Sequence, residues 1–598
     1  MLFLGLGAMI ALAGSWPVLF ARAGVKTFAL TFAAQFLFWS FCVWLNPFQT
    51  AGPLLGQSLH SRFFFSALFT CALATVVFAR TMDDDVDAKI SRVAGAVAKH
   101  SGVTSLVYLA LVAFTYVAMT SPMFHAAEYR AFAADGIAEG TWNADVSPVD
   151  PAHLRQVSLS QATWKGNKAL SQVEGGSLGS RFRIGEYQIQ KYRDELMWIA
   201  PLEYQSATVW SSADFSPGFV MVSAEDPDRE PKLVSDRKMR YLDGAYLWDN
   251  LWRHVVGSGY GTRGLMDPTF EVDDDGNPFF VYTRYDLAVG YDGAVPVGAL
   301  VVDPETGAMK EYALADLPPW IDRIMPESEA VARLGWYGDY VNGWFNSVWS
   351  KRDVIKPTDS DLSLVWTDDG RACWFSGMTS TASTDNALVS IVLMDSRTGL
   401  VREYKVNGAA DEEDVNGAVK SAVSNFKDWV PTPAIPENVY GQLAWIVPIV
   451  NGDGVPQRIA IVSADASKVA LGENVKQALA EFRRKMSEGG ERVVAGDTGT
   501  EETAQAVVER FAADVRGGNT TYLFTLAGDA RVFTGTGDVS PELSLTRVGD
   551  AVTVGFLETE EATVPVQRFD NLAIATRDPV QEQRLEEIGK SLYAPQPQ

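Results

Sequence analysis

The sequence predicts an α+β protein. We expect a four-helix transmembrane region at its N-terminus, then tandem modules of a helix plus an antiparallel sheet, and a small C-terminal β-barrel-like domain. Three observations lead to this prediction. Residues 1–120 are strongly apolar, whereas the remainder is polar and acidic. A long motif occurs at 272–312 and again, with changes, at 366–404. Short apolar runs separated by glycine turns occupy residues 521–574.

The apolar N-terminal region contains four candidate membrane spans. A transmembrane helix needs about 17–25 apolar residues, so the third candidate is at the short end of this range. Arg62 and Arg80 flank it and are long enough to reach the two interfaces. No basic segment precedes the first span, so we interpret it as a transmembrane helix and not as a cleaved signal peptide. The predicted spans are residues 2–20, 27–45, 63–78 and 103–120.

Basic residues in the short loops predict the orientation, because cytoplasmic loops carry an excess of lysine and arginine. The second loop holds only Arg62, whereas the first and third loops hold the other basic residues of this region. These are Arg22, Lys26, Arg80, Lys89, Arg92 and Lys99. We therefore expect the N-terminus and the whole chain after Thr120 to lie outside the cytoplasm.

The predicted spans contain no charged residue and no histidine, and His60 and His100 lie at span edges. An ionisable group inside the membrane would indicate a functional site. Its absence from the predicted spans argues against a proton-coupled transporter and against bis-histidine haem. We interpret the bundle as an anchor or a surface for a partner.

The repeated motif has a fixed skeleton of turn residues. Asp-Gly between apolar runs predicts one hairpin, and Asp-x-x-Thr-Gly predicts a second, tighter one. Asp303 and Asp395 open the tighter turns and should accept backbone N–H bonds there. A helix is predicted at about 246–255, before the first copy. The predicted strands are 268–274, 278–286, 296–303 and 308–314 in the first copy, and 361–367, 372–379, 386–395 and 400–406 in the second.

Two weaker relatives of the motif flank these copies, as expected for the end units of a stacked array. Trp198-Ile199-Ala200-Pro201 and Trp445-Ile446-Val447-Pro448 read as the same strand start used twice. A helix followed by hairpins with a D-x-T-G turn resembles PepSY-type, cystatin-like modules over residues 190–475, which we call the array. The segment Asn342–Asn346 is similar to one in large uncharacterised bacterial membrane proteins with a few N-terminal spans. The resemblance implies a binding or inhibitory module of the bacterial envelope, and it brings no catalytic residues.

The domain boundaries follow from these elements. Further helices are predicted at 412–429 and 473–486, and an amphipathic helix at 501–515. The predicted domains are the transmembrane region 1–120, a junction with a first atypical module at 121–235, repeat modules at 236–320 and 321–410, a last atypical module at 411–490, an OB- or SH3-like β domain at 500–580, and a tail at 581–598.

Aromatic residues crowd into the connection between the two repeats. One interpretation is packing between modules, and the other is an aromatic groove that binds a glycan or a peptide. The residues are Trp336, Tyr337, Tyr340, Trp344, Phe345 and Trp349.

Motifs with a known chemistry are missing from the sequence. It has no HExxH, CxxC, Walker A or Rossmann glycine pattern. Gly175–Gly179 matches GxSxG in letters, but its flanks are polar, unlike a nucleophile elbow. The loop at Asp273 lacks the glycine and glutamate that an EF-hand requires, so we expect a hairpin turn and no metal site. Cys373 reads as a buried strand residue.

Charge completes the sequence-based prediction. Residues 121–598 hold 43 basic and 70 acidic residues, a net charge of −27 that repels nucleic acid. We expect a non-enzymatic, multi-pass protein of the bacterial inner membrane. It would need no cofactor, and its extracytoplasmic array would bind a protein or peptidoglycan-related partner. One alternative is a structural subunit of a membrane-embedded secretion or conjugation complex. The other, an envelope hydrolase or transporter, is disfavoured by the motif search.

Overall fold

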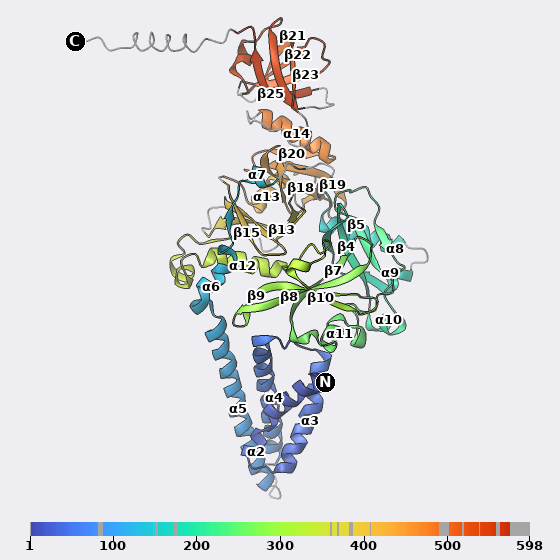
Figure 1. Cartoon of the computed structure of the whole chain (residues 1–598), viewed down its shortest axis with the longest axis vertical. Helices are drawn as coiled ribbons and strands as arrows, with labels where there is room; N and C mark the ends of the chain where they lie inside the picture. The colour runs from blue at the N-terminus through green and yellow to red at the C-terminus, as the bar shows by residue number, and fades with distance from the viewer. Residues whose placement is uncertain are drawn as a thin grey trace, which may run out of the picture. The chain divides into compact units, whose positions relative to one another are not determined.

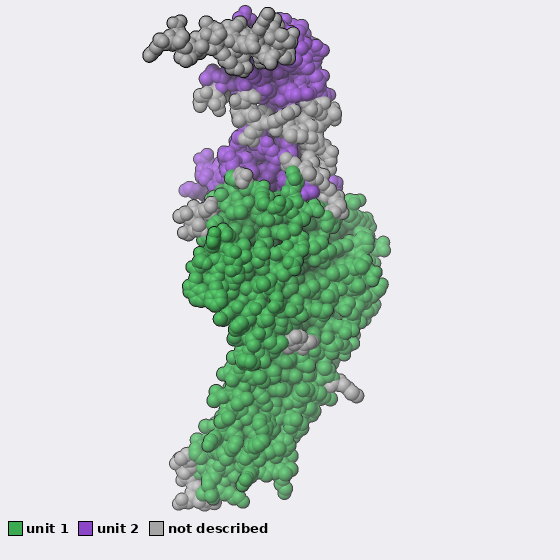
Figure 2. All heavy atoms as spheres, turned by 60° about the vertical axis from the view of Figure 1, so that its left-hand side comes forward, with its two compact units in different colours: residues 1–141, 155–414, 450–456 green, residues 142–154, 415–449, 457–598 purple. Residues whose placement is uncertain are grey.

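The chain folds as an α+β protein with four apolar N-terminal helices, several β-sheets and a closed barrel near the C-terminus (Figure 1). It divides into two compact units: residues 1–141, 155–414 and 450–456, and residues 142–154, 415–449 and 457–598 (Figure 2). The computed structural model describes residues 2–81, 88–146, 149, 153–172, 177–358, 362–367, 370–381, 387–406, 408–488, 501–516, 519–537, 539–557 and 563–574.

Four N-terminal helices are long and apolar enough to cross a membrane, which confirms the predicted number of spans. The helices of the third and fourth spans begin well before the residues predicted for those spans. Backbone hydrogen bonds continue each helix through the polar residues that precede its apolar run. A short break at Trp16 divides the first span. The helices are α1 (Leu2–Ser15), α2 (Pro17–Phe20), α3 (Val25–Leu45), α4 (Gly52–Thr81) and α5 (Ala88–Thr120).

A buried polar cluster joins α1, α3 and α4. The Gln35 amide donates to Thr70 Oγ1 at 2.6 Å and accepts a hydrogen bond from Ser66. Ser66 and Thr70 also donate to the carbonyls of Ile10 and Gly14, each at 2.9 Å. Gly14 allows this close approach, because a Cβ there would collide with Ser66 and Gln35. Small residues and interhelical hydrogen bonds are the usual means of holding membrane helices together.

Four antiparallel sheets follow, and in each the strands are neighbours in chain order. The first strand of each meander is irregular: it is either divided into two short strands that pair with the same neighbour or, in β7, interrupted by a register shift. The first contains β2 (Phe182–Ile184), β3 (Gln188–Tyr192), β4 (Glu195–Tyr204), β5 (Phe219–Ser223) and β6 (Lys232–Val234). The second contains β7 (Gly264–Val272), β8 (Pro278–Val289), β9 (Asp292–Val302) and β10 (Met309–Ala313).

The third and fourth sheets repeat this order. The third contains β11 (Ile355–Pro357), β12 (Ser363–Trp366), β13 (Ala372–Ser380), β14 (Leu388–Asp395) and β15 (Val401–Lys405), with β1 (Ala138–Glu139) added in parallel to β15. The fourth contains β16 (Val430–Pro431), β17 (Ile435–Val439), β18 (Gln442–Val450), β19 (Pro456–Ser463) and β20 (Val469–Gly472). All eight strands predicted for the two repeats are confirmed, although β7 and β9 each begin four residues earlier than predicted. The predicted starts at 361 and 386 lie outside the described residues.

A helix precedes each sheet in the chain. They are α8 (Leu159–Gln172) and α9 (Ser177–Arg181), α11 (Leu251–Gly257), α12 (Glu327–Asp339) and α13 (Glu412–Ala422). The helix predicted at 246–255 is wrong at its start, because Asn250 caps α11 by accepting from Arg253 N at 3.0 Å. The helix predicted at 412–429 ends early, at Ala422, where separate turns take over. The helix predicted at 473–486 corresponds to α14 (Val475–Glu488).

The tight turn of each repeat is held by its first residue, as predicted. Asp303 accepts the backbone N–H groups of Glu305 and Thr306, at 2.8 and 3.3 Å. Asp395 accepts those of Arg397 and Thr398, at 3.0 and 2.8 Å. In the first module Ser223 takes this place and accepts Asp226 N at 2.9 Å. These turns, which we call closing turns, therefore use their aspartates structurally.

In each closing turn, the residue that follows Ser223, Asp303 or Asp395 connects the turn to the segment that leads into the module's helix. The carbonyl of Pro304 accepts the N–H groups of Arg240 and Tyr241, at 2.8 and 3.0 Å. The carbonyl of Ser396 accepts those of Ile324 and Met325, at 3.0 and 2.6 Å. In the first module Ala224 accepts those of Gln156 and Val157, both at 2.9 Å. Three modules thus close their ends with the same backbone interaction.

A buried seam joins the first three modules. The Gln190 amide pairs with both backbone groups of Val272, at 2.6 and 2.9 Å, and so links β3 to β7. Glu271 is fully buried beside this pair, and burial raises the pKa of its carboxyl to about 8. Burial likewise raises the pKa of Asp322 to about 7, although the Lys191 N–H that it accepts at 2.6 Å opposes the shift.

The C-terminal region forms a closed barrel in the order β21-β22-β23-β25-β24. Its first strand, β21 (Glu501–Arg516), contradicts the helix predicted at 501–515. Ala504, Ala506 and Val508 alternate inward and pack on the barrel core, so sheet closure overrides the helical propensity of this alanine- and glutamate-rich segment. The other strands are β22 (Asn519–Leu526), β23 (Val532–Thr536), β24 (Ala551–Leu557) and β25 (Thr563–Asn571).

The loop between α3 and α4 is docked onto the second module. Gln49 accepts from Leu265 N at 3.3 Å and Tyr285 OH at 3.0 Å, and its amide donates to the Leu265 carbonyl. Thr50 N donates to Gly261 O at 2.8 Å. On α11, Arg253 donates to the last carbonyls of α3, those of Trp44 and Leu45, at 3.0 and 2.5 Å. The module therefore caps a membrane helix directly.

A second attachment lies at the end of α5, where α6 (Pro122–Ala134) begins. Tyr129 of α6 donates to the Thr120 carbonyl at 2.7 Å. Tyr291, at the tip of the β8–β9 hairpin, donates its backbone N–H to Thr120 Oγ1 at 3.1 Å. The bundle thus holds the second module at two separate points.

Alanine in place of Gly307 tests the closing turn. Gly307 has φ +74°, and an added Cβ would lie 2.6 Å from both His254 and Tyr241. Gly408 has the same φ with open space around it, so Gly408→Ala isolates the backbone strain, about 1 kcal/mol. Gly307→Ala should lose a further 1–3 kcal/mol or so of unfolding free energy, measured by denaturation of the full chain in detergent. Equal losses for both variants would contradict the packing argument.

Stability should fall as the pH rises through the pKa of Glu271. A carboxyl with a raised folded pKa binds more protons in the folded than in the unfolded state, so its contribution is complete below the unfolded pKa and is lost as the pH passes the folded value, about 8. We expect the unfolding free energy to decrease between about pH 5 and pH 8. Glu271→Gln should flatten this decrease. An unchanged slope in that variant would show that Glu271 does not cause it.

Candidate partner-binding surface

The aromatic segment between the repeats does not form one groove. Trp336, Tyr337 and Tyr340 lie on or at the end of α12, whereas Trp344, Phe345 and Trp349 lie in and beside the single π-helical turn that follows, η5 (Asn346–Ser350). The structure therefore separates the six predicted residues into two sets of three.

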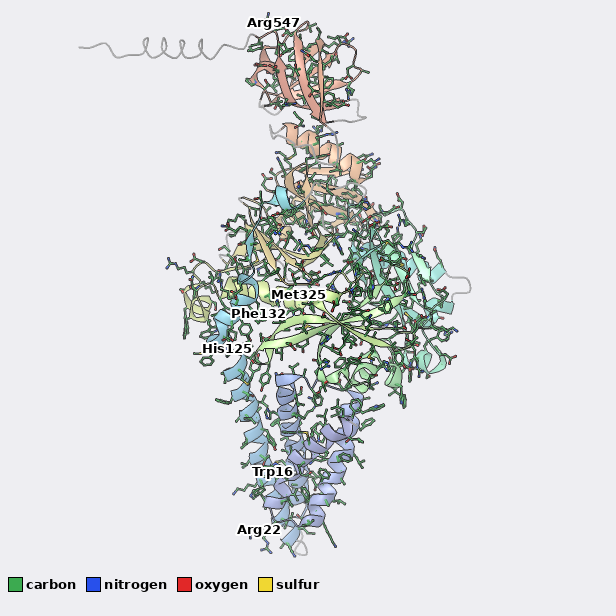
Figure 3. The ribbon with its side chains drawn as sticks, in the orientation of Figure 1. Trp16, Arg22, His125, Phe132, Met325 and Arg547 are labelled. Carbon is green, nitrogen blue, oxygen red and sulfur yellow. The ribbon has the colours of Figure 1, made fainter. Side chains whose placement is uncertain are left out.

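The first set packs between α12 and α6. The Trp336 ring lies 4.6 Å from Tyr129 and 5.7 Å from Phe132, which Figure 3 labels on α6. Tyr340 lies 6.4 Å from Tyr129, and Arg130 stacks over Tyr337 at 5.3 Å. These aromatics hold α12, and with it the third sheet, to the helix that continues from α5.

A buried ion pair completes this contact. Arg333 lies 3.3 Å from Glu329 on the same face of α12 and donates to the Ala294 carbonyl of β9 at 2.6 Å. Its guanidinium also stacks on Phe132 at 5.3 Å. Burial raises the pKa of Glu329 to about 7, although Arg333 opposes that shift. This ion pair therefore takes part in joining the second and third modules.

The second set forms an exposed cluster, which we call the aromatic tip: Trp344, Phe345, Val348 and Trp349. Phe345 and Trp349 are stacked at 5.2 Å, and Trp344 meets Trp349 edge-on at 5.7 Å. The exposed fractions are 58% for Phe345, 46% for Val348 and 67% for Trp349. Large aromatic residues gathered in the open are enriched at binding surfaces.

Hydrogen bonds hold the backbone of the aromatic tip. The buried Asn346 amide donates to the Arg352 carbonyl at 2.8 Å and accepts from Ser350 Oγ and Arg352 N, at 2.7 and 3.0 Å. Lys351 adopts a left-handed conformation with φ +49°, which reverses the chain. A preorganised surface loses little entropy when it binds. Lys351 and Arg352 beside the tip are also exposed, and the Arg352 guanidinium lies 3.8 Å from the Asp353 carboxylate.

Other candidates from the sequence have structural roles. Asp273 accepts from Asp275 N and Asn277 N at 3.1 and 2.7 Å, which makes the predicted hairpin turn. Arg237 donates to the Gly276 carbonyl of this turn at 2.6 Å, which disfavours a bound cation. Cys373 is buried in β13, as predicted. Gly175 and Gly176 of the GxSxG match, and the second-copy pair Asp368 and Asp369, lie outside the described residues, whereas the rest of the match begins helix α9.

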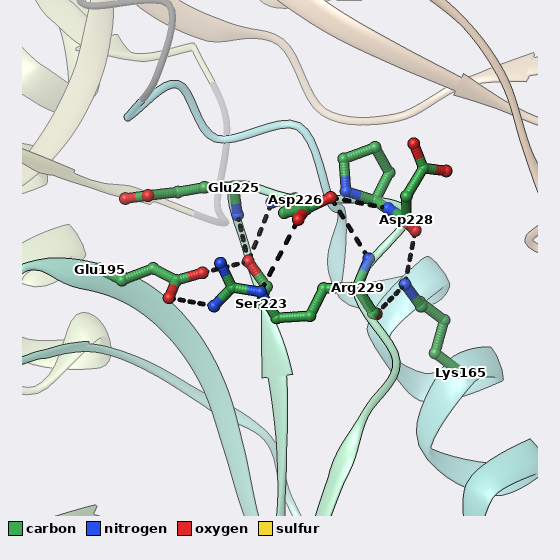
Figure 4. A network of polar contacts seen from close by, with 8 residues as sticks. Lys165, Glu195, Ser223, Glu225, Asp226, Asp228 and Arg229 are labelled. Carbon is green, nitrogen blue, oxygen red and sulfur yellow. Dashed lines mark hydrogen bonds and ion pairs between the residues drawn. The ribbon is translucent and has the colours of Figure 1, made fainter.

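An acidic stretch in the first module is also internally paired (Figure 4). The Arg229 guanidinium pairs with Glu195, and Asp226 Oδ1 accepts Asp228 N at 2.9 Å. Lys165 of α8 donates to the carbonyls of Pro227 and Arg229, at 2.5 and 2.6 Å, and burial lowers the pKa of its ammonium. Among the described residues no group of three or more histidine, cysteine or carboxylate side chains is placed to hold a metal ion.

One aromatic pair, in which one ring is exposed and the other is half-buried, was not predicted. Trp248, 65% exposed, precedes α11 and lies 5.9 Å from Trp44 at the end of α3. The signal was available, because Trp44 ends a predicted span and tryptophan is enriched at membrane interfaces. The sequence could not show that a residue two hundred positions later joins it there.

Comparison with models of known protein families and with curated proteins finds no match to this sequence. The functional argument therefore depends on the geometry described above.

Alanine substitutions should separate the two aromatic sets. Trp336→Ala removes a half-buried ring between α6 and α12 and should decrease the unfolding free energy by about 2–3 kcal/mol, below the usual range for fully buried aromatics. Trp349→Ala removes an exposed ring and should change it by less than about 0.5 kcal/mol. Thermal unfolding of the two variants in one detergent gives the comparison. A larger loss for Trp349→Ala would show that the aromatic tip is part of the core.

Proposed function

We propose that this chain is a non-enzymatic, membrane-anchored protein of the bacterial envelope whose acidic extracytoplasmic array binds a protein or a cell-wall-related partner. The observation that carries the proposal is the aromatic tip. It combines exposed stacked rings with a backbone fixed by Asn346, and the folded chain around it uses the neighbouring aromatics of the same segment for packing.

The attachment of the array to the membrane supports a scaffold role. The loop at Gln49 and the end of α5 at Thr120 both bind the second module. Because α12 packs on α6, the third module and its aromatic tip are linked to the same helices. A binding surface held in this way stands at a fixed place relative to the bilayer.

The proposed orientation follows from the side on which the array lies. The loop that contacts the second module lies at the array end of the bundle, and Arg22 lies at the opposite end (Figure 3). The loops at that opposite end contain the basic residues Arg22, Lys26 and Arg80, which favour a cytoplasmic location for it. The array would then lie outside the cytoplasm, where its acidity keeps it solvated.

The module architecture is compatible with the PepSY resemblance. Each sheet is a meander preceded in the chain by a helix, and the repeated closing turns serve folding and not catalysis. The barrel order, in which the first strand pairs with the second and fourth and the third runs parallel to the fifth, resembles an OB fold. We assign it no nucleic-acid role, since the region is acidic.

Site-specific photo-crosslinking in intact cells tests the proposal. A photoreactive residue at Trp349 should give one dominant adduct with an envelope protein or a wall fragment. The matched control is Leu400, which is 58% exposed at the β14–β15 turn of the same module. Replacing Trp344 and Phe345 by alanine should decrease the Trp349 adduct at least about tenfold, equivalent to about 1.4 kcal/mol. Equal adducts at Trp349 and Leu400, or labelling only after lysis, would overturn the proposal.

A further inference from the structure

Helix α3 fixes the position of the bilayer surface nearest the array. At 1.5 Å per residue its 21 residues span about 31 Å, which is about the thickness of the hydrocarbon layer. Apolar side chains four residues apart continue along one face to its end: Leu37 is 70% exposed, Phe41 57% and Leu45 45%. Leu45 therefore lies at one surface of the layer, and the basic residues Arg22 and Lys26 lie near the other.

Aromatic rings continue from this end of α3 onto the second module. The ring centroids of Phe41 and Trp44 are 6.0 Å apart, and the Trp44 ring lies 5.9 Å from that of Trp248. Trp248 belongs to the single 3-10 helical turn η2 (Leu247–Asp249), which immediately precedes α11. Arg253 of α11 donates to the last carbonyls of α3. The turn is therefore held beside the end of a membrane-spanning helix.

Hydrogen bonds fix the turn η2. Leu247 has φ +48°, a left-handed conformation that residues with a Cβ rarely adopt, and its carbonyl accepts a hydrogen bond from Arg253. The Asp249 carboxylate accepts from the Trp210 indole at 3.0 Å and from the Arg240 guanidinium at 2.6 Å. The turn therefore presents its outer side chains in one arrangement, which loses little entropy when they bind.

Four side chains around this turn form what we call the interfacial surface: Trp210, Tyr246, Leu247 and Trp248. Trp248 is 65% exposed, and Tyr246, which is 42% exposed, has its ring 5.8 Å from that of Trp210 on α10 (Ala207–Ser212). Figure 1 shows α10 and α11 on the side of the array that faces the bundle. Tryptophan and tyrosine are enriched at the level of the lipid headgroups, because each combines an apolar ring with a polar N–H or O–H group.

We infer that the interfacial surface lies in the headgroup layer of the bilayer that the N-terminal helices cross, and that its partner is lipid. The end of α3 places the bilayer surface at this turn, and the rings of the turn continue the aromatic sequence that α3 begins. Lipid thus contacts the first two modules directly. The inference rests on α3 and the turn, and it does not depend on the aromatic tip of the third module.

Photo-crosslinking of the full chain in lipid nanodiscs, with no other protein present, tests this inference. A photoreactive residue at Trp248 should form adducts at the headgroup, the glycerol or the first acyl carbons of the lipid. One at Leu37, near the middle of α3, should form adducts in the interior of the acyl chains.

The matched control is Asp228, which is exposed in the closing turn of the first module. Arg229 of that turn pairs with Glu195 at the start of β4, whereas α10 follows the other end of this strand. The two ends are about 30 Å apart along the strand, so Asp228 should form at least about tenfold fewer lipid adducts than Trp248.

Variants of Trp248 distinguish lipid contact from a disturbed fold. With the photoreactive residue at Tyr246, Trp248→Phe should preserve the lipid adducts, because the ring stays apolar. Trp248→Glu should decrease them at least about threefold, because a carboxylate is unfavourable where an aromatic ring is accommodated. Equal adducts at Trp248 and Asp228, adducts at Tyr246 that do not respond to Trp248→Glu, or a dominant protein adduct at Trp248 in intact cells would overturn the inference.

Discussion

One backbone carbonyl in each of the first three modules closes the module. It follows the first residue of the closing turn and accepts two consecutive N–H groups from the segment that leads into the module's helix. The last hairpin of the module is thereby joined to its beginning. Because only backbone atoms take part, the side chains around the turn are free to differ, and Ala224, Pro304 and Ser396 all serve equally. The same interaction can therefore form in each repeat even where the side chains differ, because every residue carries a backbone carbonyl.

The same reliance on backbone groups couples the array to the membrane helices. Gln49 bonds the backbone of β7 as a neighbouring strand would, and Arg253 satisfies carbonyls that the end of α3 leaves unpaired. Both interactions replace water with protein partners at a helix end and a strand edge. The second module is consequently attached to the bundle at the α3–α4 loop. A displacement of that module would be transmitted to the loop through these hydrogen bonds.

The aromatic connection between the repeats shows how one segment serves two purposes. Residues on α12 face α6, because a helix presents Trp336 and Tyr340 on one side at a spacing of four. After Tyr340 the chain turns at Gly343, so the next rings no longer belong to α12. Asn346 then fixes the turn, so Phe345 and Trp349 remain exposed. The amino-acid composition of the segment did not distinguish the packed aromatic residues on α12 from the exposed ones of the aromatic tip.

The sequence by itself determined the features that depend on neighbours in the chain. Apolar runs identified four membrane helices, and Asp-Gly and Asp-x-x-Thr-Gly identified the hairpins, because turn geometry is set by a few consecutive residues. The tertiary structure decided what depends on distant partners. Residues 501–516 became a strand because β22 and β24 lie on either side of them, and α5 was set against α4 so that the Cys71 thiol meets the Ala98 carbonyl. Local propensity is a weak prior in such places, since the pairing partner contributes more free energy than the segment's own preference.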